Sequence, residues 1–423
     1  MSPADGGALG VTSSQAVHVR PVPGWDPRAW PWWCRTLAVY AVSRVFLVVV
    51  FVQVALVQRA NLWTPARPSY LSYVAYLFDG SWYRQIAENG YPSTLPLGPD
   101  GLVAQNAWAF FPAYPMFVRG VMAVTGGTWA VVAPLVSTLL GAGAMLVIHQ
   151  LVVVGAPRAI LARPGLPLAT VAAVCAFPTS AVLQTAYTES LALLLIAGAL
   201  LLVVQRRYEW AALVVVALGF TRAVALPMAV VVVVHAAVRW RAGARGERTF
   251  GVLDRVRVGA LALVAVGSGF AWPLICGWVT GVSDGYLRTQ EAWRWAKTVQ
   301  PFFGWTYVPQ FWFGNLAPLV VIGGFALVAF VLLMPAAWRL GRELHAWSAA
   351  YVLYIVAVSE PGSSLARFLL LAFPLGASSV GLVRWTARAR RVWLVVLLGS
   401  MLALQVLWVR QIWLFNPLGD WPP

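Results

Sequence analysis

The sequence predicts an all-α, polytopic membrane protein with about eleven transmembrane helices, and three observations lead to this prediction. Of its 423 residues, 60% are hydrophobic and only 10% are charged, and the mean hydropathy is +0.75. Soluble domains are apolar at about half of their positions. The apolar residues gather in runs as long as a bilayer about 30 Å thick requires. Short segments rich in arginine separate these runs.

The charge balance is strongly basic, with 30 Lys and Arg against 14 Asp and Glu and a net charge of +16. In a soluble chain this balance would suggest nucleic acid. Here the basic residues lie between apolar runs, where they set the orientation of the chain and meet anionic headgroups. We therefore expect membrane lipids as partners and no nucleic acid. The three cysteines have no metal-site or disulfide spacing and are interpreted as small hydrophobic residues.

The chain reads as a single transmembrane domain with a tail at each end. Residues 1–35 are polar and lack the hydrophobic region of a signal peptide, so they are expected to form a disordered cytoplasmic tail. The membrane domain covers residues 36–412 and begins with a span at 37–58. A long extracytoplasmic loop follows at about 59–128. Residues 413–423 form a short extracytoplasmic tail.

Two later apolar stretches are each too long for one crossing and too short for two full ones. Residues 166–204 are interrupted around Pro178, and residues 211–238 are interrupted around Arg222. Arginine-rich segments flank both stretches, and if these segments share one side, each stretch is a hairpin whose break points outward. Short half-spans are tolerated where protein covers their ends or they line a cavity. The other predicted spans are 129–154, 259–279, 316–333, 346–358, 368–383 and 392–409, whereas 110–125 is left open as interfacial or re-entrant.

The polar residues in apolar surroundings all fall on the predicted outer side. Asp79 begins the polar part of the first loop. A carboxylate beside membrane segments costs free energy unless it is paired with a cation or has a functional role. Two compatible interpretations are open. Asp79 caps a helix that begins at Gly80, or it faces a cleft as a general base.

Two arginines are candidates for binding a lipid-linked phosphate. Arg222 and Arg367 suit this role because a guanidinium binds phosphoryl oxygens in pairs and keeps its proton. The alternative is that each extends to lipid headgroups. Glu189 is either an acceptor-binding carboxylate or the partner that neutralises Arg222.

Aromatic residues near these charges are candidates for stacking on a sugar, or they belong to the ordinary aromatic belt of a membrane protein. They are Trp82, Tyr83, Tyr91, Trp108, Tyr114 and Tyr187. Glu88 lies in the same first loop.

Five sequence blocks carry a resemblance to a known family. In chain order they are Phe78-Asp79 with Trp82-Tyr83 and Ile86-Ala87-Glu88-Asn89-Gly90-Tyr91-Pro92, then Phe110-Phe111-Pro112-Ala113-Tyr114-Pro115, then Phe177-Pro178-Thr179-Ser180 with Tyr187-Thr188-Glu189-Ser190-Leu191, then Thr221-Arg222, and last Ser363 to Arg367. Their order and spacing over about residues 78–375 resemble the PIG-V-like mannosyltransferases, relatives of the second GPI mannosyltransferase. The chain departs from that pattern at Phe368, where the family usually has Tyr, and in the 280–312 loop.

The resemblance implies a fold of the glycosyltransferase C superfamily, in the plasma membrane, with its active site outside the cytoplasm. It implies a polyprenyl-phosphate mannose donor and a glycolipid, lipoglycan or protein acceptor. Asp79 would be the general base, and Arg222 and Arg367 would bind the donor phosphate. The substrate-binding residues would be Trp82, Tyr83, Glu88, Tyr114, Tyr187 and Glu189. No metal or other cofactor is expected.

Two other function classes fit parts of the sequence. A secondary transporter or lipid flippase also uses broken helices with polar residues at the breaks. However, such proteins commonly show internal repeats, and the two halves of this chain do not look alike. A non-catalytic assembly subunit that kept the fold is the third reading.

Overall fold

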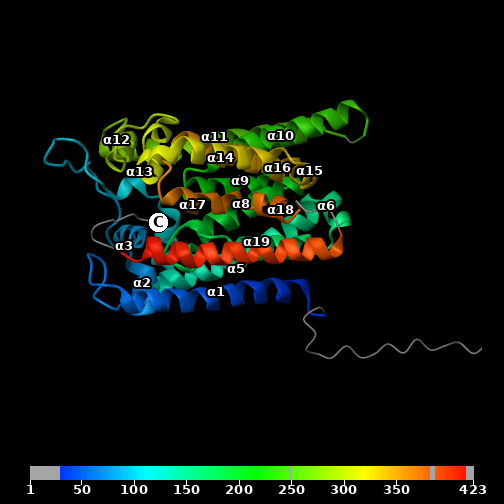
Figure 1. Ribbon diagram of the computed structural model, residues 1–423. Helices are drawn as coiled ribbons and strands as arrows, with labels where there is room; N and C mark the ends of the chain where they lie inside the picture. Colours follow the sequence, from blue (N-terminus) through cyan, green and yellow to red (C-terminus); the bar gives the residue numbers. More distant parts are fainter. Residues whose placement is uncertain (1–28, 248, 382–385, 416–423) are drawn as a thin grey trace, which may run out of the picture.

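The computed structural model describes residues 29–247, 249–381 and 386–415, and the regular elements in this part of the chain are all helical. The helices run side by side along one common direction and form an elongated bundle (Figure 1). The predicted terminal tails fall mainly on residues 1–28 and 416–423, outside the described residues. The all-helical prediction is therefore confirmed for the described chain.

Six helical segments of the described chain are long and apolar enough to cross a membrane. They are α1 (Trp32–Val57), α5 (Trp129–Gly155), α10 (Ala225–Ala244), α11 (Val252–Thr280), the Phe303–Leu333 segment that ends in α14 (Ala317–Leu333), and the Ala387–Trp413 segment that begins with α19 (Ala387–Trp408). Each overlaps a predicted apolar stretch, which confirms the membrane character of the chain. The predicted count of about eleven crossings stays a prediction.

The two interrupted stretches are broken where the sequence predicts. The first is divided into α7 (Leu166–Ala176), the short helix η2 (Ser180–Gln184) and α8 (Glu189–Val204). The second is divided into α9 (Tyr208–Gly219) and α10. Helix α8 packs against α5 and α9, so these breaks lie inside the bundle.

Side chains from distant helices satisfy the backbone groups that the first break frees. Arg44 in α1 donates from Nη1 to the carbonyl of Ser180 at 2.7 Å, and Gln405 in α19 donates from Nε2 to the carbonyl of Phe177 at 2.9 Å. Both side chains are buried. Irregular backbone at membrane depth is stable only when its polar groups are paired in this way.

One predicted span differs from the structure. Residues 368–383 were expected to form a single helix, but the chain forms α17 (Ser364–Leu369), η5 (Leu370–Ala372) and α18 (Pro374–Val380). Proline fits the first turn of a helix and disfavours continuation from the preceding turn, so Pro374 starts a new helix. Residues 382–385 lie outside the described chain.

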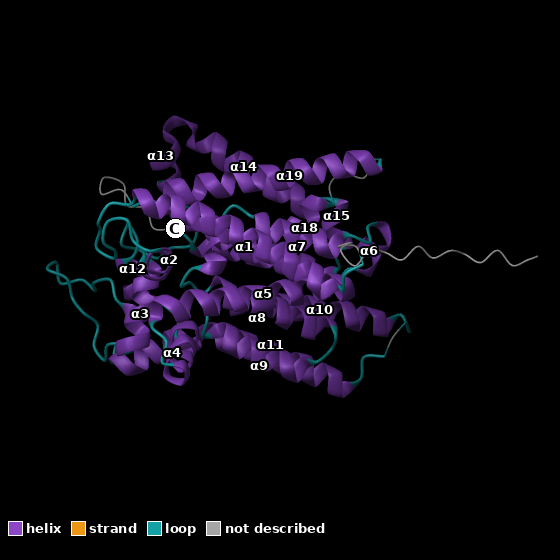
Figure 2. Cartoon of the chain, turned by 90° about the horizontal axis from the view of Figure 1, so that it is seen from below, coloured by secondary structure: helices purple, strands orange, loops and turns teal. Residues whose placement is uncertain are grey.

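Short helices and loops gather at one end of the bundle, at the left of Figure 1. They include α2 (Tyr70–Tyr76), α3 (Asp79–Asn89), α4 (Ala113–Thr125), α12 (Gly285–Ala292) and α13 (Val308–Phe313). The view from below keeps α2, α3, α4 and α12 at the same end (Figure 2). Helix α4 has 13 residues and packs against α3 and α5. At 1.5 Å per residue it is about 20 Å long, which is short for a membrane crossing.

The opposite end of the bundle carries α6 (Pro157–Ala162), α15 (Pro335–Arg339) and the beginning of α19 (Figure 1). The main hydrophobic core extends between the ends and is built from α1, α5, α7, α8, α10, α16 (Arg342–Val358) and α18, among others. The polar loop end and the arginine-bearing end are thus separated by a packed apolar interior.

Candidate functional site

Asp79 is the first residue of α3, and its side chain does not cap the helix. Its Oδ2 lies 2.7 Å from Nη1 of Arg367 instead. The prediction of a cap for a helix beginning at Gly80 is therefore wrong, although a carboxylate in the first turn still interacts favourably with the helix dipole. The preceding residue, Phe78, has a φ of +52° and is buried. A bulky residue in this region is strained, and such strain is often found at functional sites.

Arg367 lies between two carboxylates. Besides its contact with Asp79, its Nε is 3.4 Å from Oε1 of Glu189. The guanidinium carbon is 4.9 Å from the ring centroid of Tyr187 and 5.3 Å from that of Phe368. Only 6% of the side chain is exposed. An arginine that extends to lipid headgroups would be exposed at its tip, so that alternative is wrong for Arg367.

Arg222 reaches the same carboxylate from the break between α9 and α10. Its Nη1 is 2.5 Å from Oε1 of Glu189 and donates to Oγ1 of Thr188 at 2.9 Å. Its guanidinium carbon is 4.9 Å from the ring centroid of Phe368. The predicted pairing of Glu189 with Arg222 is confirmed. Asp79, Glu189, Arg222 and Arg367, which we call the charged cluster, are thus linked in one chain of ion pairs.

The two breaks and the start of α3 explain how the charged cluster forms. Glu189 begins α8 after the first break, and Arg222 lies in the second break before α10. Arg367 comes from α17, which makes the pair with Asp79 a contact across 288 positions of sequence. Buried charges are tolerated when they are paired and hydrogen-bonded. The two carboxylates and two guanidiniums are paired without a net charge, although among the described residues Nε of Arg367 makes no hydrogen bond.

Exposure differs within the charged cluster. The Glu189 side chain is fully buried, whereas the side chains of Asp79 and Arg222 each keep 15% of their surface exposed. Among the described residues, Oε2 of Glu189 has no hydrogen-bond partner. Glu189 therefore holds the two arginines together from inside, and Asp79 and Arg222 are the members that solvent or a ligand reaches first.

Tyr187 and Tyr83 support the charged cluster. The hydroxyl of Tyr187 accepts a hydrogen bond from the backbone N–H of Asp79 at 3.3 Å, and the hydroxyl of Tyr83 lies 3.4 Å from Oγ1 of Thr188. Burial, and next the nearby charge of Asp79, raise the pKa of Tyr83 above its usual range. Both tyrosines are buried, so they position Asp79 and Thr188 rather than offer an open ring face.

Two of the predicted substrate-binding residues lie apart from the charged cluster. Glu88 is on the exposed side of α3, where its Oε1 pairs with Nε of Arg84 one turn earlier at 2.7 Å. Tyr114 is fully buried, and its hydroxyl contacts the carbonyl of Ala133 at 3.0 Å and Oγ of Ser137 at 2.8 Å. The structure does not bring either side chain to Asp79.

Trp82 lies one turn after Asp79 in an aromatic group with residues from other segments. It stacks on Phe110, with ring centroids 5.7 Å apart, and meets Trp293 edge-on at 5.3 Å. All three side chains are partly exposed. Trp293 comes from the 280–312 loop, so this loop closes over the polar end near α3. Of the predicted aromatic residues, Trp82 is the one with exposed surface beside Asp79.

Sequence reasoning missed the part played by Phe368. Its ring is within about 5 Å of both guanidinium carbons, a distance at which cations and aromatic faces attract. The signal was its position directly after Arg367, but adjacency alone does not show which arginine shares the ring. A Tyr at this position would present the same ring with an added hydroxyl.

The chain matches no protein-family model, and no characterised protein is significantly similar to it. Within residues 29–247, 249–381 and 386–415, no three His, Cys, Asp or Glu side chains are grouped so that they could hold a metal ion. The charged cluster itself offers two kinds of reactive group. These are a carboxylate that accepts a proton and two guanidiniums that bind an anion.

Proposed function

We propose that this protein is an inverting glycosyltransferase, which moves a mannosyl residue from a polyprenyl-phosphate sugar to an acceptor hydroxyl. One observation carries the proposal. A partly exposed carboxylate and two guanidiniums, from segments far apart in the sequence, meet beside the first polar loop of a membrane protein. This set supplies a base and a phosphate-binding group at one place. The identity of the sugar and of its lipid carrier is inferred from the resemblance of the five sequence blocks.

In the proposed reaction, Asp79 accepts the proton of the acceptor hydroxyl as its oxygen attacks the anomeric carbon. The bond between that carbon and the phosphate oxygen breaks, and polyprenyl phosphate leaves with the bonding electrons. Arg222 and Arg367 stabilise the negative charge that develops on the phosphate. Attack from the face opposite the phosphate converts a β-mannosyl phosphate into an α-mannoside.

The ion pairs of the charged cluster suggest how donor binding prepares the base. Without a donor, Asp79 is held by Arg367. A donor phosphate competes for the same guanidinium, and its binding would free the Asp79 carboxylate for the acceptor hydroxyl. Glu189 stays buried between the arginines and keeps both within reach of one phosphate.

The finer architecture belongs to the same proposal. We propose a fold of the glycosyltransferase C type in the plasma membrane, with about eleven crossings and the N-terminus in the cytoplasm. The α3 end would then face the extracytoplasmic side. The positions of the breaks and the basic segments at the α6 end support this orientation, because basic residues favour the cytoplasmic side. The acceptor is a glycolipid, a lipoglycan or a protein.

Transfer of isotopically labelled mannose tests the proposal. Purified full-length protein is incubated with labelled polyprenyl-phosphate mannose and with membranes from cells that lack this protein. Mass spectrometry then follows the label into glycolipids, lipoglycans and proteins. We expect Asp79→Asn to reduce transfer by about 10²- to 10⁴-fold. Asp284→Asn is the matched control, because Asp284 is an exposed residue paired with Arg288 within α12's first turns. Near-normal transfer by Asp79→Asn would exclude Asp79 as the base.

A transporter or flippase of a lipid-linked or anionic substrate is the second candidate. The breaks between α7 and α8 and between α9 and α10, with Glu189 and Arg222 beside them, favour it. In proteoliposomes this function would move labelled donor lipid between leaflets without breaking its phosphate–sugar bond. Release of free polyprenyl phosphate, dependent on acceptor, distinguishes the transferase.

A further inference from the structure

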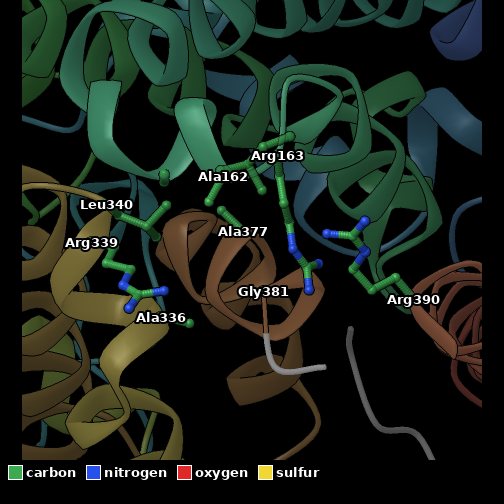
Figure 3. Close-up of a pocket in the computed structure, with 10 residues that line it drawn as sticks. Ala162, Arg163, Ala336, Arg339, Leu340, Ala377, Gly381 and Arg390 are labelled. Atoms are coloured by element: carbon green, nitrogen blue, oxygen red, sulfur yellow. The ribbon is translucent and has the colours of Figure 1, made fainter. Parts of the chain in front are cut away.

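A cavity of about 220 Å³ lies at the end of the bundle opposite the charged cluster. It is formed where α6, the start of α7, α15, α18 and α19 meet, and Figure 3 shows the residues that line it. Arg163, Arg339 and Arg390 line it, and none of the described residues that line it is Asp or Glu. A cavity with three arginines and no acid is suited to an anion.

The three arginines reach the cavity from separate segments. Arg163 follows α6, Arg339 ends α15, and Arg390 lies in the first turns of α19. In Figure 3 the side chains of Arg163 and Arg390 extend toward the same part of the cavity, and Arg339 approaches from α15. Arg163 donates from Nη1 to the carbonyl of Val380, which ties its guanidinium to the end of α18. The convergence therefore comes from the fold and not from one basic run.

Burial distinguishes Arg390 from the basic residues around it. Arg388 and Arg391 lie in the same turn of α19 and are exposed, whereas Arg390 is partly buried. Arg163 and Arg339 are partly buried as well. Partial burial of like charges is unfavourable unless an anion compensates them.

Some of the other arginines at this end have acidic partners. Nη1 of Arg239 is 2.8 Å from Asp254, and Nε of Arg257 is 2.7 Å from Glu209. In the described part of the chain, no carboxylate pairs with Arg339 or Arg390 within 4.0 Å. Arg339 and Arg390 therefore have no compensating carboxylate among the described residues.

The rest of the cavity wall is apolar. Leu166, Leu340 and Ala377 contribute to it, together with further alanines. The adjoining helix α14 presents exposed apolar side chains along its length, among them Leu327 and Leu333. A ligand with a charged group for the arginines and hydrocarbon for these surfaces fits this arrangement better than a fully hydrated anion does.

We propose that this cavity binds the phosphate group of an anionic phospholipid from the leaflet at the α6 end. The arginines hold the phosphoryl oxygens, and the acyl chains lie along the apolar helix surfaces. The site is separate from the charged cluster, and the proposal does not depend on sugar transfer. Free inorganic phosphate offers the same oxygens without the hydrocarbon, so the two ligands can be distinguished.

Binding of phosphatidylglycerol to the full-length protein tests this. The purified chain in a neutral detergent is titrated with phosphatidylglycerol, and bound lipid is measured by native mass spectrometry. We expect Arg339→Gln combined with Arg390→Gln to raise the Kd at least about tenfold, because the loss of a single hydrogen bond to a charged group raises a Kd by about tenfold or more. Arg388→Gln combined with Arg391→Gln removes the same charge from the exposed residues and should change the Kd less than about twofold.

A second variant keeps every charge and fills the cavity. Ala336 lines the cavity, and Ala336→Leu should weaken phosphatidylglycerol binding while it leaves the net charge unchanged. Equal weakening by the two arginine pairs, or unchanged binding in Ala336→Leu, would overturn the proposal. Inorganic phosphate that displaces the lipid completely at an equal concentration would overturn the lipid assignment.

Discussion

Both the charged cluster and the cavity lined by Arg163, Arg339 and Arg390, which we call the arginine cavity, bring arginines together, but the partners of these arginines differ. In the charged cluster, the buried Arg367 pairs with Asp79 and Glu189, the partly buried Arg222 pairs with Glu189, and the four charges cancel. In the cavity, Arg339 and Arg390 are also partly buried, but no acid is present among the described residues of the wall. The difference lies in the partners: carboxylates of the same chain neutralise the arginines of the charged cluster, whereas we propose that an external anion neutralises Arg339 and Arg390.

The largest expected effect is on stability, and it comes from the shared carboxylate. Glu189→Ala leaves two buried guanidiniums with only Asp79, so we expect a loss of about 3–5 kcal/mol in the free energy of unfolding. Unfolding of the purified protein in detergent measures it. Glu88→Ala is the control, because an exposed pair within one helix contributes at most about 1 kcal/mol. Equal losses would mean that Glu189 does not hold the arginines together.

The next largest expected effect concerns the donor phosphate. Arg222→Gln removes one of the two guanidiniums proposed to bind the phosphate. We therefore expect mannose transfer per folded molecule to fall about 10²- to 10³-fold. Arg288→Gln, at an exposed residue of α12, is the control. If both variants transfer at the same rate, Arg222 has no phosphate role and serves only to neutralise Glu189.

Phe368 should have a smaller effect. Its ring faces the guanidiniums of both arginines in the charged cluster, and Phe368→Leu removes that attraction while it keeps an apolar side chain. We expect a cost of about 0.5–2 kcal/mol, seen mainly as weaker donor binding. Phe368→Tyr keeps the ring and should bind the donor nearly as well as the natural chain. A donor Kd unchanged in Phe368→Leu would show that the ring is only packing.

The smallest expected effect is a pH dependence of stability at the α6 end. There, unlike the cavity arginines Arg339 and Arg390, Glu343 has a partner of opposite charge, His235, when that histidine is protonated. Burial is the largest single influence and raises the pKa of Glu343. The hydrogen bond with Nδ1 of His235 at 2.8 Å, a backbone hydrogen bond and the nearby charges of His235 and Arg342 together lower it more, so the pKa lies below its usual value. A lowered folded-state pKa gives stability that is present above the unfolded pKa, about 4.3, and is lost as the pH falls through the folded one. Wild type should therefore lose more stability than Glu343→Gln below about pH 4. Parallel unfolding curves of the two proteins against pH would contradict this.

The helical layout could be predicted because it depends on local signals. Long apolar runs place α1, α5 and α11, and Pro178 and Arg222 mark the two breaks. The sequence allows the pairing of Glu189 with Arg222 as one of two alternatives, and the structure contains this pair.

The contacts that complete the charged cluster could not be predicted, because they depend on tertiary packing. Nothing local brings Arg367 to Asp79, because this contact is made by α17, which comes from a distant part of the sequence. Glu88 illustrates the reverse case. It belongs to the same motif as Asp79, but the helical period turns it outward to Arg84. The arginine cavity likewise joins three segments that no sequence pattern connects.

Separate measurement of donor binding and turnover in Asp79→Asn tests the central claim most directly. A base is needed for the chemical step and not for holding the donor, and the variant also frees Arg367 for the phosphate. We therefore expect the Kd for polyprenyl-phosphate mannose to stay the same or fall while kcat drops by about 10²- to 10⁴-fold. A normal kcat, or a loss of transfer fully explained by weaker donor binding, would contradict the assignment of Asp79 as the base.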